Sequence, residues 1–371
     1  MSARRRNEID YTLLLLAMTL VVVGLVMVYS ASAIWADQNL GNSLYFIKRQ
    51  AFWTCLGVVS MATLSRLDYN RFKEWMWLVL GATVLGLGAA LISPPIAGVR
   101  RWIRFGPIGL QPAEFAKLTS VLFLAHYLDR KRSRVISAPL RGLIAPTGIV
   151  MILLVLIGLE PDLGTPALMF CVSLLLLFIG GGKIQYILGA LVAAIPALIY
   201  EVMKYPYRRA RLLIFLSPWK DAQGKGYQIA QSLLAVGSGG WFGKGLGGGK
   251  LKLMYLPTPH TDFIFPVVCE ELGLLGALTC VSLFAMLLVR GVRIARSAPN
   301  LFGTLLAAGI TFTICLQAFF NMAMSIGMLP TKGIPLPFIS FGGSSLLATL
   351  SGIGILLNIS RQAKTEIQPA A

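Results

Sequence analysis

Hydrophobic residues gather along the chain into ten long runs that alternate with polar segments. Each run is close to the roughly 20 apolar residues that a helix needs to cross a bilayer. None shows the period-two alternation of a membrane-spanning β-strand. The pattern therefore predicts an all-α polytopic membrane protein with ten transmembrane helices and both termini on one side. The predicted spans are residues 11–33, 46–64, 75–93, 112–128, 140–158, 163–180, 184–203, 264–289, 301–327 and 342–360.

Lys and Arg residues in the short polar segments set the predicted orientation, because cytoplasmic loops are enriched in them. One side of the predicted bundle carries the basic clusters at 4–6, 66–73, 130–134, 290–296 and 361–364. We therefore place that side, and both termini, in the cytoplasm. The outer side then carries one long extracytoplasmic loop between the seventh and eighth helices, at about 205–261.

The composition agrees with a membrane protein and excludes other classes. Of the 371 residues, 56% are hydrophobic and 13% are charged, whereas a soluble domain has about 25% charged residues. A soluble enzyme and a disordered chain are excluded, and residues 1–371 are predicted to form one membrane domain. The net charge is +18, but the basic residues are scattered between apolar runs. This favours an anionic lipid or lipid-linked substrate as the partner, and not nucleic acid.

The predicted outer face carries more basic residues than the orientation rule expects. Arg101 and Arg104 lie between the third and fourth spans, and Arg208 and Arg209 begin the long loop. They suit a cationic cradle for a phosphate-bearing ligand at the outer membrane surface. The alternative is charge without a function, because long translocated loops are exempt from the rule.

An acid and a base open the fourth span. Glu114 and Lys117 are three residues apart, so they share one face of a helix and can pair. Charged groups at membrane depth normally face a bundle interior or a wet cavity. A structural ion pair and a role in a substrate site both remain open.

A glycine-rich stretch at 236–250 contains Gly243, Gly245 and Gly248 in GxGxxG spacing. The βαβ unit that a dinucleotide site requires does not accompany it. We interpret the stretch as a mobile loop with tight turns, and its backbone N–H groups as a weaker candidate for binding phosphate. Glu270 and Glu271 lie further on, in the eighth span, where we expect one of them to bond to a neighbouring helix.

The segment Leu256–Phe265 places Asp262 where the basic outer loop meets the eighth span. Nearby cations and a helix N-terminus are expected to favour the ionised carboxylate there. Asp262 is our candidate general base, and the alternative is that Thr261 or Asp262 simply caps the helix. The simplest interpretation of Asp162, which precedes the sixth span, is likewise that it caps that helix.

A second irregular segment, 330–345, holds three prolines and three glycines on the outer face. Irregular backbone at membrane depth is tolerated only where it lies against protein or lines a cavity. We therefore add His260, Lys332 and Ser344, from the two irregular segments, to the candidate substrate-binding residues. The chain has two histidines in all, which excludes a histidine-rich metal site.

Four stretches of the chain closely resemble the SEDS family (shape, elongation, division and sporulation). They are Gly106–Lys117, Pro161–Thr165, Leu256–Phe265 and Pro330–Ser345, and the resemblance extends over nearly the whole chain. Residues 24–33 are more similar to the FtsW division and sporulation branch than to the RodA elongation branch. Thr258 and Pro259 depart from the family pattern, which often has Glu and Ala there.

The resemblance implies a ten-helix peptidoglycan glycosyltransferase in the bacterial cytoplasmic membrane that polymerises lipid II at the outer leaflet. It implies a class B penicillin-binding protein (a transpeptidase) as partner, with other membrane proteins of division or elongation. It also implies that Asp262 is the essential aspartate, that Glu114 is a site glutamate, and that Lys117 and the outer arginines line the same cavity.

The residues themselves fit this chemistry. Polymerisation needs a base for the acceptor hydroxyl and cations for the departing pyrophosphate. This leaving group needs neutralisation of its charge more than it needs protonation. No cofactor is firmly implied, and a divalent cation, Mg²⁺ or Mn²⁺, is left open. The alternative function is a lipid II flippase, which would also need a polytopic bundle and anion-binding residues, but not one irreplaceable outer carboxylate.

Overall fold

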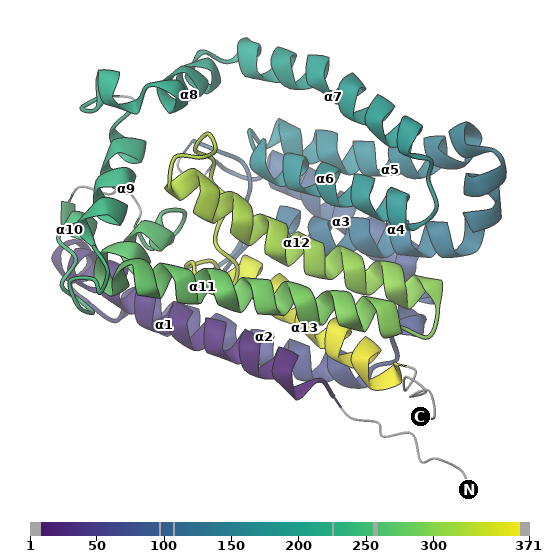
Figure 1. Ribbon diagram of the computed structural model, residues 1–371, viewed down its shortest axis with the longest axis horizontal. Helices are drawn as coiled ribbons and strands as arrows, with labels where there is room; N and C mark the ends of the chain where they lie inside the picture. Colours follow the sequence, from purple (N-terminus) through teal and green to yellow (C-terminus); the bar gives the residue numbers. More distant parts are fainter. Residues whose placement is uncertain (1–8, 96–97, 107, 225, 255–258, 364–371) are drawn as a thin grey trace, which may run out of the picture.

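The computed structural model describes residues 9–95, 98–106, 108–224, 226–254 and 259–363, which form a mostly helical bundle (Figure 1). The ten longest described helices coincide in order with the ten predicted spans. They are α1 (Tyr11–Leu40), α2 (Tyr45–Arg66), α3 (Phe72–Ile92), α4 (Pro112–Ser137), α5 (Pro139–Leu159), α6 (Gly164–Ile179), α7 (Ile184–Lys204), α11 (Ile264–Ser297), α12 (Leu301–Ser325) and α13 (Gly343–Gln362).

Shorter elements fill the connections between these helices. The segment between α7 and α11 is helical for much of its length, with α8 (Pro206–Leu216), η2 (Pro218–Asp221), α9 (Tyr227–Ser238) and α10 (Leu251–Met254). A 3-10 turn, η1 (Tyr69–Arg71), precedes α3. Strands β1 (Ile103–Phe105) and β2 (Ile108–Leu110) form a small antiparallel hairpin before α4, in the register Ile103 to Leu110.

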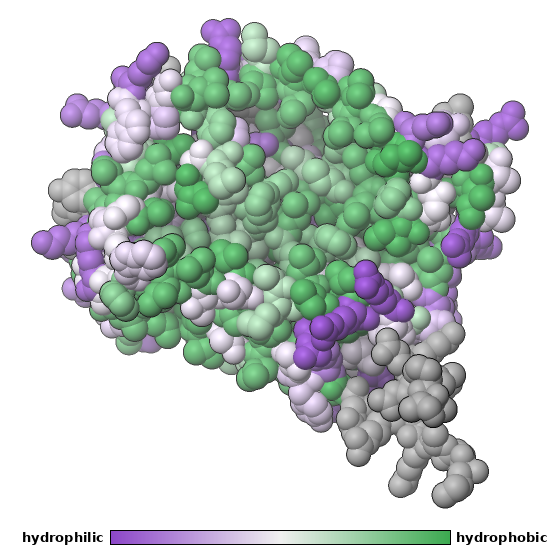
Figure 2. Space-filling view, viewed as in Figure 1, coloured by the Kyte–Doolittle hydropathy of each residue, from purple (hydrophilic) through white to green (hydrophobic). Residues whose placement is uncertain are grey.

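Seven helical segments among the described residues are long and apolar enough to cross a membrane. They correspond to α1, η1 with α3, most of α5, α7, α11, α12 and α13, while α6 is apolar but shorter. In Figure 2 a broad band of hydrophobic side chains covers the middle of the visible face, and hydrophilic side chains gather toward its ends. The chain is thus a multi-pass membrane protein in character. The count of ten spans stays a prediction.

The described chain ends lie together at one end of the bundle (Figure 1). The backbone N–H of Asp10, before α1, donates to Ser360 Oγ in α13 at 3.3 Å. Arg290, near the end of α11, lies 4.0 Å from the Asp10 carboxylate. The start of α11, where Asp262 lies, is therefore at the opposite end of the bundle.

Close backbone contacts hold the bundle around its irregular segments. A Cβ on Gly24 of α1 would collide with the carbonyl of Phe338, and a Cβ on Gly354 of α13 would lie 2.6 Å from the Met61 carbonyl of α2. Small residues at such contacts let membrane helices approach closely. The 330–342 segment is consequently seated directly on α1.

Helix α7 stands apart from this packed bundle. It has no buried residue, and Figure 1 shows α7 and α8 arching over the other helices. Because α7 leaves its apolar side chains exposed, the space beneath it can be lined by hydrophobic groups.

Candidate functional site

A cavity of about 790 Å³ lies between α7, α8 and the end of the bundle that holds Asp262. Its charged lining residues are Arg101, Asp162, Arg211, Asp262 and Lys332. On the α7 side its lining is apolar and consists of Leu198, Ile199, Val202 and Met203, while α8 contributes Leu212 beside Arg211. A cavity that is charged on one side and apolar on the other suits a lipid with an anionic head group.

Asp262 lies in the turn that leads into α11 and faces this cavity. The helix begins after Phe263 and has no side-chain cap, so capping does not account for Asp262. Burial raises the pKa of Asp262 to about 6, and the nearby Asp162 raises it further, while Arg101 and Arg211 oppose the shift. Arg101 and Arg211 favour the ionised carboxylate, as expected, but desolvation outweighs them, so the pKa lies above its ordinary value of 3.8 while the group stays mostly ionised at pH 7.

Hydrogen bonds join the Asp262 segment to the 330–342 segment. Ser340 Oγ accepts from the Leu336 N–H at 2.8 Å and donates to the Thr261 carbonyl at 2.6 Å. The Phe341 N–H donates to the His260 carbonyl at 2.8 Å. The two segments that carry the candidate site residues thus form one unit, as their sequence character suggested.

Asp162 and Arg101 shape the opposite side of the cavity. Asp162 accepts from the Gly164 N–H at 2.9 Å and from Thr165 Oγ1 at 2.9 Å, which confirms its predicted cap of α6. Arg101 donates to the carbonyls of Glu160 at 2.8 Å and Pro161 at 2.6 Å. Its guanidinium therefore stabilises the α5–α6 link as well as lining the cavity.

Glu160, within that link, is a fully buried carboxyl group. Neither of its carboxylate oxygens has a hydrogen-bond partner among the described residues. Burial and the nearby Asp162 raise the pKa of Glu160 to about 8, against a smaller lowering effect of Arg101. This side chain is therefore mostly protonated at pH 7.

We expect Glu160→Gln to stabilise the protein increasingly as the pH rises. The folded state loses stability between pH 4.5 and 8, because only the unfolded chain ionises this group there, and the loss is complete above pH 8. Gln removes the titration. Thermal unfolding in detergent should show a midpoint several degrees higher than that of the parent at pH 8, and little difference at pH 4.5. An equal difference at both pH values would contradict the shift.

Glu114 and Lys117 form the predicted ion pair, at 2.7 Å, with both side chains buried. Lys117 Nζ also donates to Gln317 Oε1 of α12 at 2.5 Å, and Gln317 Nε2 donates to the Pro335 carbonyl at 2.9 Å. Neither member of the pair lines the cavity. The structure supports the structural alternative, in which the pair braces the 330–342 segment from behind, while a substrate-binding role for it stays a prediction.

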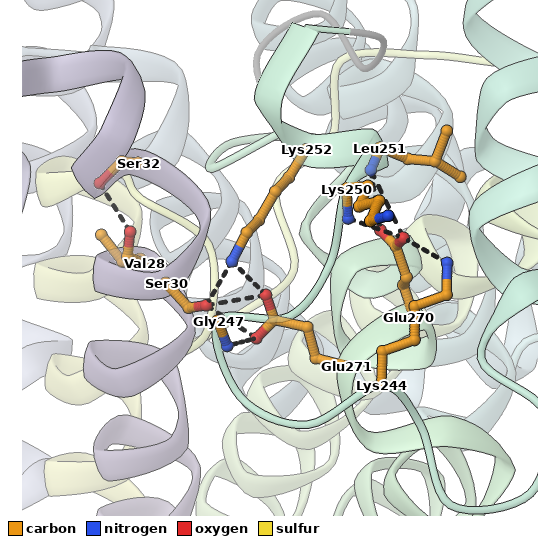
Figure 3. Close-up of polar contacts among 10 residues, drawn as sticks. All are labelled: Val28, Ser30, Ser32, Lys244, Gly247, Lys250, Leu251, Lys252, Glu270 and Glu271. Atoms are coloured by element: carbon orange, nitrogen blue, oxygen red, sulfur yellow. Dashed lines mark hydrogen bonds and ion pairs between the residues drawn. The ribbon is translucent and has the colours of Figure 1, made fainter. Parts of the chain in front are cut away.

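The glycine-rich stretch encloses the protein's own carboxylates (Figure 3). Glu270 accepts from Lys244 Nζ at 2.9 Å and from the Lys250 N–H at 3.0 Å. Glu271 accepts from the Gly247 N–H at 3.1 Å and pairs with Lys252. The backbone N–H groups considered for phosphate thus bind glutamates, and part of the basic charge of the loop is neutralised there.

Glu271 also anchors this loop to α1. Ser30 Oγ of α1 donates to both Glu271 oxygens, at 2.8 and 2.7 Å, which confirms the expected bond to a neighbouring helix. Gly273 has φ 66° and interrupts the helical backbone inside α11, where Trp241 and Gly243 lie against it. The loop is therefore held in place, contrary to the expectation of a mobile one.

The remaining predicted residues lie away from the cavity lining. The side chains of Arg104, on β1, and of Arg209 are exposed to solvent, and the side chain of Arg208 lies outside the described part of the chain. Ser344 is buried and accepts from the Gln111 N–H at 3.0 Å. The structure therefore does not bring Arg104 and Arg209 to Asp262.

His260 is buried among aromatic rings beside the cavity segment. Its ring centroid lies 4.3 Å from that of Phe46 and 5.8 Å from that of Phe341. Burial lowers the pKa of His260 to about 4, so the ring is neutral at pH 7. It packs against these aromatic rings and is not a cavity-lining residue.

Within the described residues no group of three or more His, Cys, Asp or Glu side chains could hold a metal ion. Mg²⁺ is commonly bound through one or two carboxylates together with substrate phosphates. Asp162 and Asp262 are the carboxylates that face the cavity, so they are the residues to which a divalent cation would bind.

The fold and cavity define a multi-pass membrane protein with a charged site next to an apolar wall. Residues 10–365 match the FtsW, RodA and SpoVE family model, described as "cell cycle protein", and the chain belongs to this family. It is 44% identical over 363 residues to the probable peptidoglycan glycosyltransferase FtsW of Geobacter metallireducens, covering 96% of this chain and 95% of that one. It is 39% identical to stage V sporulation protein E of Bacillus subtilis, covering 97% and 99%.

Solved structures agree with this assignment. A chain from a peptidoglycan synthase complex, described as coordinating polymerization and crosslinking, has a TM-score of 0.78 and 31% identity, covering 95% of this chain and 98% of that one. The rod shape determining protein RodA of Thermus thermophilus has a TM-score of 0.71 and 27% identity, covering 96% and 98%. The similarity to FtsW and sporulation proteins confirms the predicted branch.

Proposed function

We propose that this chain is a peptidoglycan glycosyltransferase that polymerises lipid II, with Asp262 as general base. The observation that carries the proposal is the Asp262 carboxylate in a cavity that also contains cationic groups and an apolar wall on α7. Relatives named as probable peptidoglycan glycosyltransferases support the same activity. In this proposal the cavity opens to the outer leaflet, ten helices cross the cytoplasmic membrane, and both termini are cytoplasmic.

The cavity supplies each group that the transfer needs. The acceptor hydroxyl gives its proton to Asp262 as its oxygen bonds to the anomeric carbon of the donor sugar. The bond from that carbon to the pyrophosphate breaks, and the pyrophosphate leaves with the electron pair. Arg211 and Lys332 line the same cavity and neutralise the developing charge, while Arg101 holds the α5–α6 link in shape. The polyprenyl chain lies along the apolar side chains of α7.

Glycan formation by the purified protein in detergent with lipid II tests this function. No membrane separates two compartments in that assay, so polymer can form only by catalysis. Lipid II that remains monomeric, with and without a class B penicillin-binding protein, would instead favour a flippase. We place that partner against α11 and α12, next to the two irregular segments, in line with the crosslinking role named for the related complex.

The rate of polymerisation is expected to fall in acid with a midpoint near pH 6. A general base acts only when ionised, and burial raises the pKa of Asp262 to about 6 from an ordinary value of 3.8. Initial rates at lipid II concentrations well below KM, which report kcat/KM and therefore the free enzyme, would show this fall as an acid limb between pH 4 and 8. A limb centred near pH 4 would mean that the carboxylate is well hydrated in the free enzyme.

Arg211→Ala is expected to weaken lipid II binding about 10- to 150-fold, since a charge-assisted hydrogen bond is worth about 1.5–3 kcal/mol. Arg211 lines the cavity and lies 3.4 Å from the Thr331 carbonyl. Arg104→Ala is the matched control, because Arg104 is exposed and lies outside the described cavity lining. If the two variants lose the same affinity in a lipid II binding assay, the position of Arg211 in the cavity does not matter and only the overall positive charge does.

A further inference from the structure

Asn321 joins the two irregular segments that border the cavity. It lies near the end of α12 and is fully buried. Its Nδ2 group donates one hydrogen bond to the Asp262 carbonyl at 2.9 Å and another to the Ile334 carbonyl at 2.7 Å. Both N–H bonds of one amide are thus used to tie these segments together.

The hydrogen bond from Asn321 to the Ile334 carbonyl affects the Asp262 carboxylate, because Gly333 precedes Ile334 and lies next to that carboxylate. A Cβ placed on Gly333 would lie 3.2 Å from Asp262 Oδ2, so the Gly333 backbone lies directly against the carboxylate. The helix α11 has no side-chain cap that would fix the preceding turn. The Asn321 amide therefore holds both the backbone of Asp262 and the wall against which its side chain lies.

The same wall limits how much water reaches the carboxylate. Burial is the largest cause of the raised pKa of Asp262. The charged groups that face the carboxylate are Asp162 from the α5–α6 link, Arg101, Arg211 from α8, and Lys332 from the 330–342 segment. None of these is on α12, so a change at Asn321 alters the position of the segments without changing the charge of the cavity.

We infer that Asn321 is a positioning residue, whose amide holds the Asp262 carboxylate against Gly333 in the geometry that proton transfer requires. The inference rests on the proposed role of Asp262 as general base. Asn321 itself is fully buried and is not one of the cavity-lining residues. A displacement of about 1 Å at a catalytic group can cost about 100-fold in rate.

The test compares Asn321→Ala with Asn358→Ala. Asn358 is a buried amide of α13 at the opposite end of the bundle, where it donates to the Ser65 carbonyl at 3.0 Å and accepts from the Tyr69 N–H at 3.0 Å. Its replacement likewise removes two hydrogen bonds to segments distant in sequence, and also one from Gln362 Nε2 within α13 at 3.1 Å, far from Asp262. If Asn321→Ala does not purify folded, Asn321→Ser, which keeps one donor, takes its place.

We expect Asn321→Ala to lower kcat about 100-fold with KM for lipid II nearly unchanged. Its acid limb should move below pH 6, because a loosened carboxylate gains water. Asn358→Ala should reduce thermal stability but keep the kcat of the folded fraction and the limb near pH 6. If Asn321→Ala matches Asn358→Ala in both kcat and pH profile, the residue is structural only and the inference is overturned.

A second measurement does not need glycan synthesis. With the native cysteines replaced, Asp262→Cys places a thiol at the same site, and a small charged methanethiosulfonate reports its access from the cavity. Adding Asn321→Ala should change the modification rate several-fold, whereas adding Asn358→Ala should not. Equal rates in all three proteins would overturn the positioning role. A parent protein that makes no glycan would count against the proposed function alone.

Discussion

Asp262→Asn is expected to fold, insert and bind lipid II but to make almost no glycan. The change keeps the size of the side chain and removes the group that accepts the proton from the acceptor hydroxyl. A positioned general base typically contributes about 10²–10⁴-fold to rate. The structure sharpens this expectation, because α11 begins after Phe263 without a side-chain cap, and loss of a cap cannot therefore explain a loss of activity.

Asp10→Asn is the matched control for that experiment. Asp10 is a true cap, which accepts from the Leu13 N–H at 2.9 Å at the start of α1, at the end of the bundle away from the cavity. Asn caps a helix about as well as Asp, so this variant should polymerise lipid II normally. Near-normal polymerisation by Asp262→Asn would falsify the proposed base and leave the residue a structural role in the turn.

The helices could be predicted from the sequence because each apolar run is long and continuous. Their ends were predicted less well. The first predicted span ends at residue 33, but α1 continues through Asp37 to Leu40 and stops at Gly41, whose φ is 64°. Backbone hydrogen bonds do not depend on side-chain polarity, so a helix can extend beyond its apolar part until a residue such as glycine adopts a left-handed conformation.

The site was predictable only in part. The irregular character of the Asp262 and 330–345 segments was visible in their prolines and glycines. The cavity contribution of Asp162 and the bridging role of Asn321 were not, because both depend on contacts between residues far apart in the chain. A polar residue inside an apolar run was the available signal for Asn321, since such residues usually face a bundle interior.

The glycine-rich loop shows why charge counts can mislead. Lysines add to the positive charge of this outer loop, but Lys244 and Lys252 pair with Glu270 and Glu271, which the sequence places in the eighth span. The loop folds back on α11 at Gly273, where the helical backbone is interrupted. The positive φ of Gly273 allows the loop backbone at Trp241 and Gly243 to approach α11 closely. The position of this glycine within an apolar run did not indicate that the loop would pack there.

Glu271→Gln is expected to be the most destabilising single polar substitution in this region, because it breaks the buried ion pair with Lys252. Both side chains are nearly inaccessible, and Ser30 Oγ accepts from Lys252 Nζ at 2.8 Å. Glu271→Gln leaves the ammonium group buried without its counter-charge, and removing one partner of a buried pair typically costs about 3–5 kcal/mol. Thermal unfolding in detergent should show a large drop in the midpoint temperature.

Two further variants separate the buried charge from the general loss of an ion pair. Asp129→Asn breaks the partly exposed pair with Lys73, at 2.7 Å, and should cost about 0–1 kcal/mol. Combining Glu271→Gln with Lys252→Met removes the uncompensated charge, so the double variant should recover much of the lost stability. If the double variant is no more stable than Glu271→Gln alone, the loss lies in the hydrogen bonds from Ser30 and Gly247, and not in the buried ammonium group.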